Sequence, residues 1–216
     1  MTLTLYGYRY SVYTRIARMT LAALNVDYIS VEVDPFADPP DPELAKVTRF
    51  HRVPVLDHDG FTLCETSVIT RYLATTLPGT NLIPDGPKAQ ARMAQTIAII
   101  DAYGYWPMVR QVFSHGVFRP LIGADADPQI VQQGLAAATP ILAQLNDIAA
   151  EGLVLNGPLT LADLHLAPML GYFAMAPQGA QALQTHPALT KWWDKMQQHP
   201  TYIATDPSLA TLSPQA

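Results

Sequence analysis

The chain has 216 residues, of which 49% are hydrophobic, and it carries a formal net charge of -5 at pH 7. The length allows one large domain or two small ones, and the pattern along the chain favours two. The acidic charge, with no cluster of Lys and Arg, excludes nucleic acid as the expected partner, because phosphate binding needs clustered cations. No stretch approaches the ~20 apolar residues of a membrane span, so we expect a cytoplasmic protein with no membrane contact.

Cys64 is the only cysteine, which excludes an internal disulfide and a cysteine-rich zinc cluster. The six histidines are scattered, with no HExxH spacing, so we predict no bound metal. Cys64 falls in a predicted strand, where it is expected to be a small core residue.

The first residues predict a βαβ unit. We expect a strand at 2–6, a helix at 12–25 whose apolar residues recur at helical spacing, and an alternating strand at 28–33. Because a helix connects the two strands, they are expected to be parallel. Four prolines within residues 34–43 predict an exposed loop.

The next elements complete a small sheet. Strands at 53–57 and 62–64 flank the turn signal "HDG" and are expected to pair antiparallel. A helix at 66–77 follows, because its apolar residues fall on one face. Residues 1–78 therefore predict one α/β domain of βαβ-loop-ββα order.

The rest of the chain predicts helices alone, after a proline-rich linker at 79–87 that marks the domain boundary. Residues 115–127 are expected to form a loop. Thr160 should cap a helix with Asp163 at position N3. The all-α domain at 88–216 should contain four long helices, the first two bent at Pro107 and Pro140; they are expected at 88–114, 128–151, 161–175 and 187–198.

Val53-Pro54 opens a strand with a residue that cannot donate a ladder hydrogen bond. One interpretation is a trans proline that protects an edge strand. The other is a cis proline that leaves the N–H and C=O of Val53 free to pair with a peptide-like ligand.

Glu65 and Thr66 stand at the start of the last helix of the first domain. Thr66 can cap that helix, whose unpaired N–H groups attract a carboxylate, and Glu65 can hold an ammonium group. A ligand with both groups on one carbon, and a peptide backbone beyond them, would fit these residues and Val53. A plain helix cap beside a solvated acid is the alternative.

The run "LYGYRYSVYTRIARMTLAALNVDY", followed by "FHRVPVL", "LCETSVITRYL" and "LTLADLHLAPML", resembles cytosolic glutathione transferases of the serine-type, bacterial-like kind. The resemblance covers nearly the whole chain and is most specific within "RVPVL" and "ETSVI". It implies a thioredoxin-like N-terminal domain with a cis-proline, an all-α helical-bundle C-terminal domain and a homodimer. It also implies a transferase that uses glutathione as its co-substrate, with a role in detoxification.

The resemblance gives roles to residues of the first domain. Val53-Pro54 would present the main chain of Val53 to the cysteinyl part of glutathione. Glu65 and Thr66 would hold the γ-glutamyl group. Arg52, with His51 as a second candidate, would lie near the glycyl carboxylate.

The thiol of glutathione needs a group that stabilises its thiolate. Ser11 directly precedes the first helix, where the resemblance places the activating serine, and its hydroxyl and the positive helix end both favour a thiolate. Ser11 can instead act only as a helix cap. Tyr8, at the end of the strand, is the competing candidate, and Tyr6 is a third.

Aromatic residues crowd the segment "DAYGYWPMVRQVF". Such a surface can bind an apolar electrophile, and packing within the bundle or a dimer is the alternative. The residues expected to form this hydrophobic substrate site are Tyr10, Tyr103, Tyr105, Trp106 and Phe113.

We predict an enzyme that binds glutathione, stabilises its thiolate and directs it at a hydrophobic electrophile. Val12 and Tyr13 replace the serine and cysteine of isomerase-type relatives, which argues against maleylacetoacetate-type isomerisation. The alternatives are a glutathione-dependent peroxidase or lyase, and a noncatalytic interaction or stress protein with the same fold.

Overall fold

A computed structural model describes residues 2–209 of the chain and divides them into two compact units. The first unit contains the chain up to Asn81 together with the segment Ala204–Pro207, and the second contains Leu82–Ile203. Within the part of the chain that the structure describes, no helix combines the length and the hydropathy that a membrane span requires.

A four-stranded sheet in the order β2-β1-β3-β4 forms the centre of the first unit. β1 (Leu3–Gly7) pairs parallel with β2 (Ile29–Glu32) and antiparallel with β3 (Val55–His58). β3 pairs antiparallel with β4 (Phe61–Leu63). The predicted strand directions are therefore confirmed.

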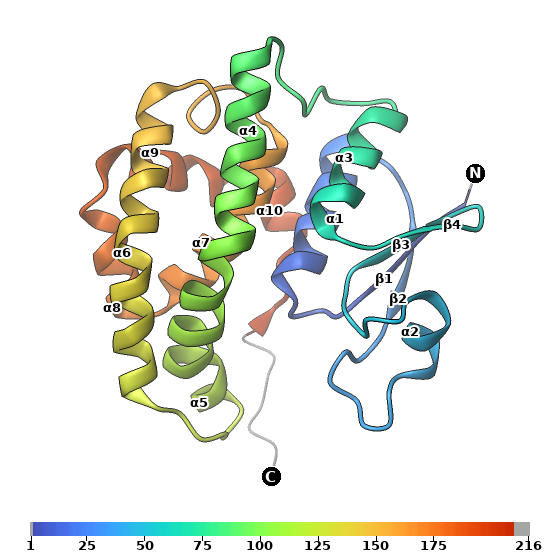
Figure 1. The fold of residues 1–216 in the computed structure, drawn as a ribbon, viewed down its shortest axis with the longest axis horizontal. Helices are drawn as coiled ribbons and strands as arrows, with labels where there is room; N and C mark the ends of the chain where they lie inside the picture. Colours follow the sequence, from blue (N-terminus) through green and yellow to red (C-terminus); the bar gives the residue numbers. More distant parts are fainter. Residues whose placement is uncertain (1, 210–216) are drawn as a thin grey trace. The chain divides into compact units, whose positions relative to one another are not determined.

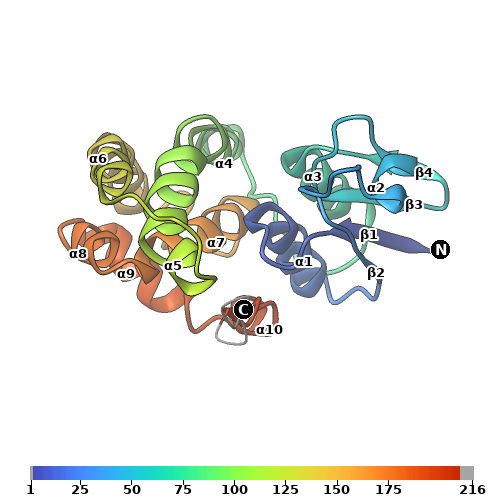
Figure 2. The same ribbon diagram turned by 90° about the horizontal axis from the view of Figure 1, so that it is seen from below.

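Two helices cover one face of this sheet. α1 (Val12–Leu24) and α3 (Thr66–Thr76) pack against each other on that side, and α2 lies on the opposite side (Figure 1 and Figure 2). Leu5 and Leu56 are register partners whose side chains share one face, and both are fully buried. Their burial supplies the hydrophobic free energy that holds the sheet together.

The opposite face has its own small core. Leu44 of α2 (Pro42–Val47) packs with Val33 and Val55, and Tyr6 and Val53 pack against this cluster. The side chain of Val53 is thereby anchored beneath α2.

The loop predicted at 34–43 is wrong in its last two residues, because Pro42 and Glu43 begin α2. Proline fits the first position of a helix, where no N–H is needed. The side chain of Asp41 accepts hydrogen bonds from the N–H groups of Glu43 at 2.9 Å and Leu44 at 3.2 Å, so the sequence contains a complete helix start.

The second unit is helical throughout, and helix α7 lies in its interior. Every residue of α7 from Leu161 to Phe173 is buried, because α4, η1, α8 and α9 all pack against it (Figure 2). η1 is a π-helix that contains Pro107. The helices are α4 (Pro87–Ile99), η1 (Ile100–Phe118), α5 (Arg119–Leu121), α6 (Pro128–Glu151), α7 (Leu161–Met175), α8 (Pro177–Gln184), α9 (Pro187–Met196) and α10 (Pro200–Ala204).

The predicted α/β domain with a cis-proline, followed by an all-α part, is confirmed. The predicted loop at 115–127 is wrong for residues 115–121, which are helical, and confirmed for residues 122–127. Packing of η1 against α6 and α7 outweighs the turn preference of Gly116 and Pro120. Helices α8 and α10 were not predicted.

Asp163 completes the predicted cap at the start of α7. Its carboxylate is buried and accepts hydrogen bonds from the N–H and hydroxyl of Thr160, both at 2.7 Å, and from the indole N–H of Trp192 at 2.8 Å. Burial raises the pKa of the Asp163 carboxyl, although these hydrogen bonds act to lower it. The capping box is thus confirmed, and it also ties α7 to α9.

We expect Asp163→Asn to lower the free energy of unfolding of the second unit by about 1–3 kcal/mol, because an amide must turn an N–H toward Thr160 or Trp192. Tryptophan fluorescence during urea unfolding measures this loss, since all three tryptophans lie in the second unit. Asp147→Asn, at an exposed position of α6, is the matched control. Equal losses in the two variants would contradict the assigned role.

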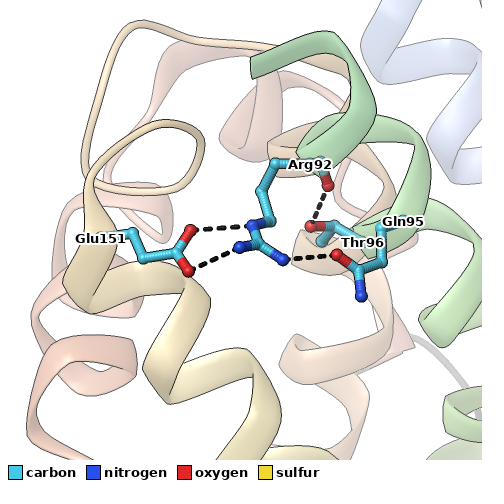
Figure 3. Close-up of polar contacts among 4 residues, drawn as sticks. All are labelled: Arg92, Gln95, Thr96 and Glu151. Atoms are coloured by element: carbon cyan, nitrogen blue, oxygen red, sulfur yellow. Dashed lines mark hydrogen bonds and ion pairs between the residues drawn. The ribbon is translucent and has the colours of Figure 1, made fainter. Parts of the chain in front are cut away.

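An ion pair joins α4 to the end of α6 (Figure 3). Arg92 donates to the carboxylate of Glu151 from Nε at 2.8 Å and from Nη2 at 2.6 Å, and Nη1 donates to Gln95. The two charged side chains are 27% and 38% exposed, so solvent weakens their attraction.

A double-mutant cycle of Arg92→Met and Glu151→Gln should give a coupling energy of about 0.5–1 kcal/mol at low salt. The coupling should shrink in about 1 M NaCl, where screening is strong. A coupling that does not respond to salt would show that packing of the arginine stem, and not charge, joins the helices.

Candidate active site

The strand register brings three chain segments to one edge of the sheet. Tyr6 pairs with Val55, and Leu56 pairs with Leu63. The end of β1, the start of β3 and the end of β4 are therefore neighbours, and α1 and α3 both begin just beyond that edge. Every site residue that the sequence predicts in the first domain, apart from Tyr6 within β1, falls in these segments.

Tyr8 and Ser11 are the first and last residues of one turn that links β1 to α1. The N–H of Ser11 donates to the C=O of Tyr8 at 3.0 Å, as in a β-turn. The hydroxyl of Ser11 accepts from the N–H of Thr14 at 3.2 Å, so Ser11 is the N-cap of α1. Ser11 therefore caps α1, and its hydroxyl also stands at the positive end of the helix, where the alternative role as thiol activator would place it.

Gly7 allows α1 to begin close to the sheet. A Cβ at this position would lie 2.3 Å from Cγ2 of Thr14, which is far inside van der Waals contact. The hydroxyl of Thr14 accepts from the N–H of Tyr8 at 3.3 Å. Close approach at Gly7 thus holds the first turn of α1 against the start of the turn that carries Tyr8 and Ser11.

The phenol of Tyr8 lies in a partly apolar environment formed by two neighbouring aromatic rings. Its ring makes edge contacts with Tyr10 and Phe36, with centroids 5.6 and 5.7 Å apart. Burial, followed by the nearby charges of Asp34 and Glu32, raises the pKa of Tyr8. Its hydroxyl stays protonated at neutral pH and can donate a hydrogen bond.

Tyr6 occupies a different face. Its side chain packs against the cluster beneath α2, among Val33, Leu44 and Val55. The alternation that puts Leu5 on the α1 side puts Tyr6 on the α2 side. The ring of Tyr6 is therefore partly buried on the α2 side of the sheet.

The Val53-Pro54 bond is cis. Within residues 2–209, neither the N–H nor the C=O of Val53 has a hydrogen-bond partner. The side chain of Val53 is anchored in the cluster of α2, so its main-chain groups are held in place while remaining free to bind.

The start of α3 differs from the prediction. Glu65, and not Thr66, is the N-cap residue, and no side chain of the described residues caps the helix. Thr66 is instead the first residue of the helix and is buried. The N–H groups of Thr66 and Ser67 have no partner within the described part of the chain. They remain available to an anion, and Ser67 is a residue that sequence reasoning missed.

The backbone of Glu65 has φ 68° and ψ 114°, a conformation that residues other than glycine rarely adopt. Such a conformation costs about 1–3 kcal/mol and is concentrated at functional sites. His51 also has a positive φ, of 50°. The side chains of His51, Arg52 and Glu65 are all exposed.

The predicted aromatic residues of the second unit separate into two groups. Tyr103 and Trp106 on η1 are 65% and 63% exposed. Phe113 is buried, and its ring stacks on Tyr172 with centroids 4.0 Å apart. Phe113 therefore packs in the core of the unit and leaves little surface for a substrate. Tyr105 is half-buried.

Within residues 2–209, no group of three or more His, Cys, Asp or Glu side chains could hold a metal ion. Cys64 is half-buried immediately after β4, so the prediction that it is a core residue holds only in part.

Comparison with known proteins gives the family. The family model "Glutathione S-transferase, N-terminal domain" matches residues 1–75, and "Glutathione S-transferase, C-terminal domain" matches residues 128–195. Together they match more than half of the chain. Glutathione S-transferase F13 of Arabidopsis thaliana is 28% identical over 99% of both chains.

Solved structures agree. The crystal structure of glutathione transferase F7 from Populus trichocarpa has 26% identity and a TM-score of 0.81, covering 94% of this chain and 97% of that one. A glutathione S-transferase from Methylobacillus flagellatus, solved with GSH bound, has 25% identity and a TM-score of 0.75, covering 99% of this chain and 100% of that one. The chain therefore belongs to the glutathione S-transferase family, as its motifs predicted.

Proposed function

We propose that this protein is a glutathione transferase that binds glutathione at the sheet edge described above, holds its thiol as the thiolate and directs it at a hydrophobic electrophile. One observation carries the proposal. The Ser11 hydroxyl at the start of α1, the free main chain of Val53 and the free N–H groups at the start of α3 lie at one edge of one sheet.

Glutathione fits this edge by its chemistry. The main chain of Val53 would pair with the cysteinyl part in the manner of an added strand. The α-carboxylate of the γ-glutamyl end would accept from the N–H groups of Thr66 and Ser67, and Glu65 would hold its ammonium group. Arg52, with His51 beside it, would attract the glycyl carboxylate.

Ser11 is proposed as the group that stabilises the thiolate. Its hydroxyl can donate to the thiolate while its lone pair accepts from the N–H of Thr14. The α1 dipole adds to this stabilisation. Tyr8 remains the competing donor, since it begins the same turn that ends at Ser11.

The electrophile is proposed to contact exposed aromatic rings. Tyr103 and Trp106 offer such rings on η1, and the half-buried Tyr105 is proposed to contribute as well. Tyr10 is proposed for the same role beside the thiol, because it belongs to the turn that carries Ser11.

We also propose that the protein is a cytoplasmic homodimer. β4 is a three-residue edge strand, and Phe61 on it is 54% exposed. Val68 of α3 and Phe50 are 49% and 67% exposed. Exposed apolar side chains such as these, one of them on an edge strand, favour coverage by a partner. Sedimentation velocity of the protein and of Phe61→Asp tests this: a dimer in the wild type and a monomer in the variant are expected.

Two measurements test the proposed function. Calorimetry should detect glutathione binding, and mixing with glutathione and a chloronitrobenzene should give conjugate at a rate proportional to enzyme. Binding without turnover over a panel of electrophiles would support a noncatalytic relative. Absence of binding would refute the proposal.

A further inference from the structure

The turn from Tyr8 to Ser11 carries both candidate hydroxyls. Its own hydrogen bond joins Ser11 N–H to Tyr8 C=O at 3.0 Å. Arg9 is the second residue of the turn, so any group that holds Arg9 also fixes the positions of Tyr8 and Ser11.

Arg9 is held from two distant parts of the chain. Its N–H donates to Oε1 of Glu32, the last residue of β2, at 2.7 Å. Its side-chain Nε donates to the C=O of Pro207 at 2.8 Å, across 198 residues of sequence. Pro207 ends the segment Ala204–Pro207, which belongs to the first unit although it follows Leu82–Ile203 of the second unit in the sequence.

The guanidinium group makes a third contact within the turn. Its carbon lies 5.9 Å from the centre of the Tyr10 ring, within the range of a cation–π interaction. The Tyr10 ring in turn meets the edge of Tyr8 at 5.6 Å. One residue therefore joins the end of β2, the C-terminal segment and both aromatic rings of the turn.

We propose that Arg9 is a positioning residue of the enzyme: clamped by Glu32 and by the C=O of Pro207, it holds the Tyr8–Ser11 turn so that the Ser11 hydroxyl meets the glutathione thiolate. This inference rests on the proposed function. A hydrogen bond to a reacting atom is effective only when its donor is held in place, and small displacements reduce rates sharply. The C-terminal segment is then a part of the active site.

The contacts of Arg9 differ from those of an ordinary surface arginine. Its side chain donates to a main-chain carbonyl. A neutral carbonyl attracts a cation less strongly than a carboxylate does, but the hydrogen bond to it fixes the orientation of the guanidinium group. The carboxylate of Glu32 accepts a hydrogen bond from the main-chain N–H of Arg9. Both bonds therefore act on the geometry of the turn.

The test compares Arg9→Met, which keeps the apolar stem and removes the donor, with Arg9→Lys, Glu32→Ala and Glu32→Gln in the full chain. Arg71→Met, at an exposed position of α3, is the matched control. Arg9→Met and Glu32→Ala should raise the pKa of bound glutathione and lower kcat about tenfold, with KM changed by less than about twofold. Glu32→Gln keeps the acceptor and should resemble the wild type, and Arg9→Lys should recover part of the loss.

Amide hydrogen exchange in the free protein gives a second readout. Exchange at Ser11 should be faster in Arg9→Met than in the wild type or Arg71→Met, whatever the ligand. Lower stability with unchanged thiol pKa, kcat and Ser11 exchange would overturn the proposal. If the wild type neither binds nor turns over glutathione, the proposed function fails, and Ser11 exchange alone then decides whether Arg9 clamps the turn.

Discussion

Ser11→Ala is expected to raise the pKa of enzyme-bound glutathione by about two units and to lower kcat/KM near pH 6.5 about 100-fold, which corresponds to about 2.7 kcal/mol. The loss has a physical cause. A charge-assisted hydrogen bond from the hydroxyl contributes about 1.5–3 kcal/mol to the thiolate and much less to a neutral thiol, whose sulfur is only a weak acceptor. Thiolate absorbance during a pH titration measures the pKa directly.

The controls separate catalysis from capping. Ser11→Ala also removes the cap of α1, which costs about 1 kcal/mol of stability. Ser11→Thr keeps both the hydroxyl and the cap, and should retain most of the activity. Tyr8→Phe should leave the thiol pKa near its wild-type value. If Tyr8→Phe raises that pKa and Ser11→Ala does not, the hydroxyl assignment is reversed.

His165 is expected to make the second unit sensitive to acid. Its ring is fully buried in α7, Nδ1 lies 2.9 Å from the C=O of Leu161, and Nε2 has no hydrogen-bond partner among residues 2–209. Burial lowers the pKa of His165 to about 4, against about 6.5 for an unperturbed histidine. Between about pH 4 and pH 6.5 the imidazole of His165 is therefore neutral in the folded protein and protonated in the unfolded chain.

The sign of the effect follows from this difference. A depressed pKa gives stability that is fully present above about pH 6.5 and is lost as the pH falls toward 4. The loss reaches about 3 kcal/mol below pH 4, because each pKa unit corresponds to about 1.4 kcal/mol. Asp163 acts in the opposite direction: its raised pKa favours the folded state at low pH and this advantage disappears as the pH rises.

The test is His165→Gln, which keeps one donor for Leu161 and removes the titration. Urea unfolding at pH 7.5 and 4.5, followed by tryptophan fluorescence, should show that the stability difference between the two pH values shrinks by about 2–3 kcal/mol in this variant. His186→Gln, at a half-buried position, should keep the contribution of His165. An unchanged difference in His165→Gln would mean that other groups cause the acid sensitivity.

Much of the fold could be predicted because local pattern and global packing agree. The alternation of β2 and the helical spacing of α1 each predicted their elements to within a few residues. The first residues of α6 and α7, Pro128 and Leu161, were both predicted correctly. Asp127 and Thr160 are the N-cap residues of these helices.

The missed helices share one cause. α2, α8 and α10 are short, and each begins with proline. Proline breaks a helix when it lies in the interior, but it is favourable at the first helical position. The continuation of η1 past residue 114 could not be predicted, because it depends on packing against α6 and α7.

The site could be predicted only where local sequence motifs mark its residues. Val53, Glu65 and Thr66 are marked by local motifs, and the register brings their segments together. Glu65 is the N-cap residue because of its backbone conformation. The conformational preferences of glutamate do not predict that conformation. The bond from Arg9 to Pro207 joins residues 198 positions apart, and no pattern in the sequence connects them.

The central claim is that the free main chain of Val53 and the open start of α3 together hold glutathione. A crystal structure with saturating glutathione tests it most directly. We predict hydrogen bonds from the cysteinyl part to both the N–H and the C=O of Val53, with the γ-glutamyl carboxylate on the N–H groups of Thr66 and Ser67. Glutathione bound elsewhere, with the main chain of Val53 still unpaired, would contradict the account.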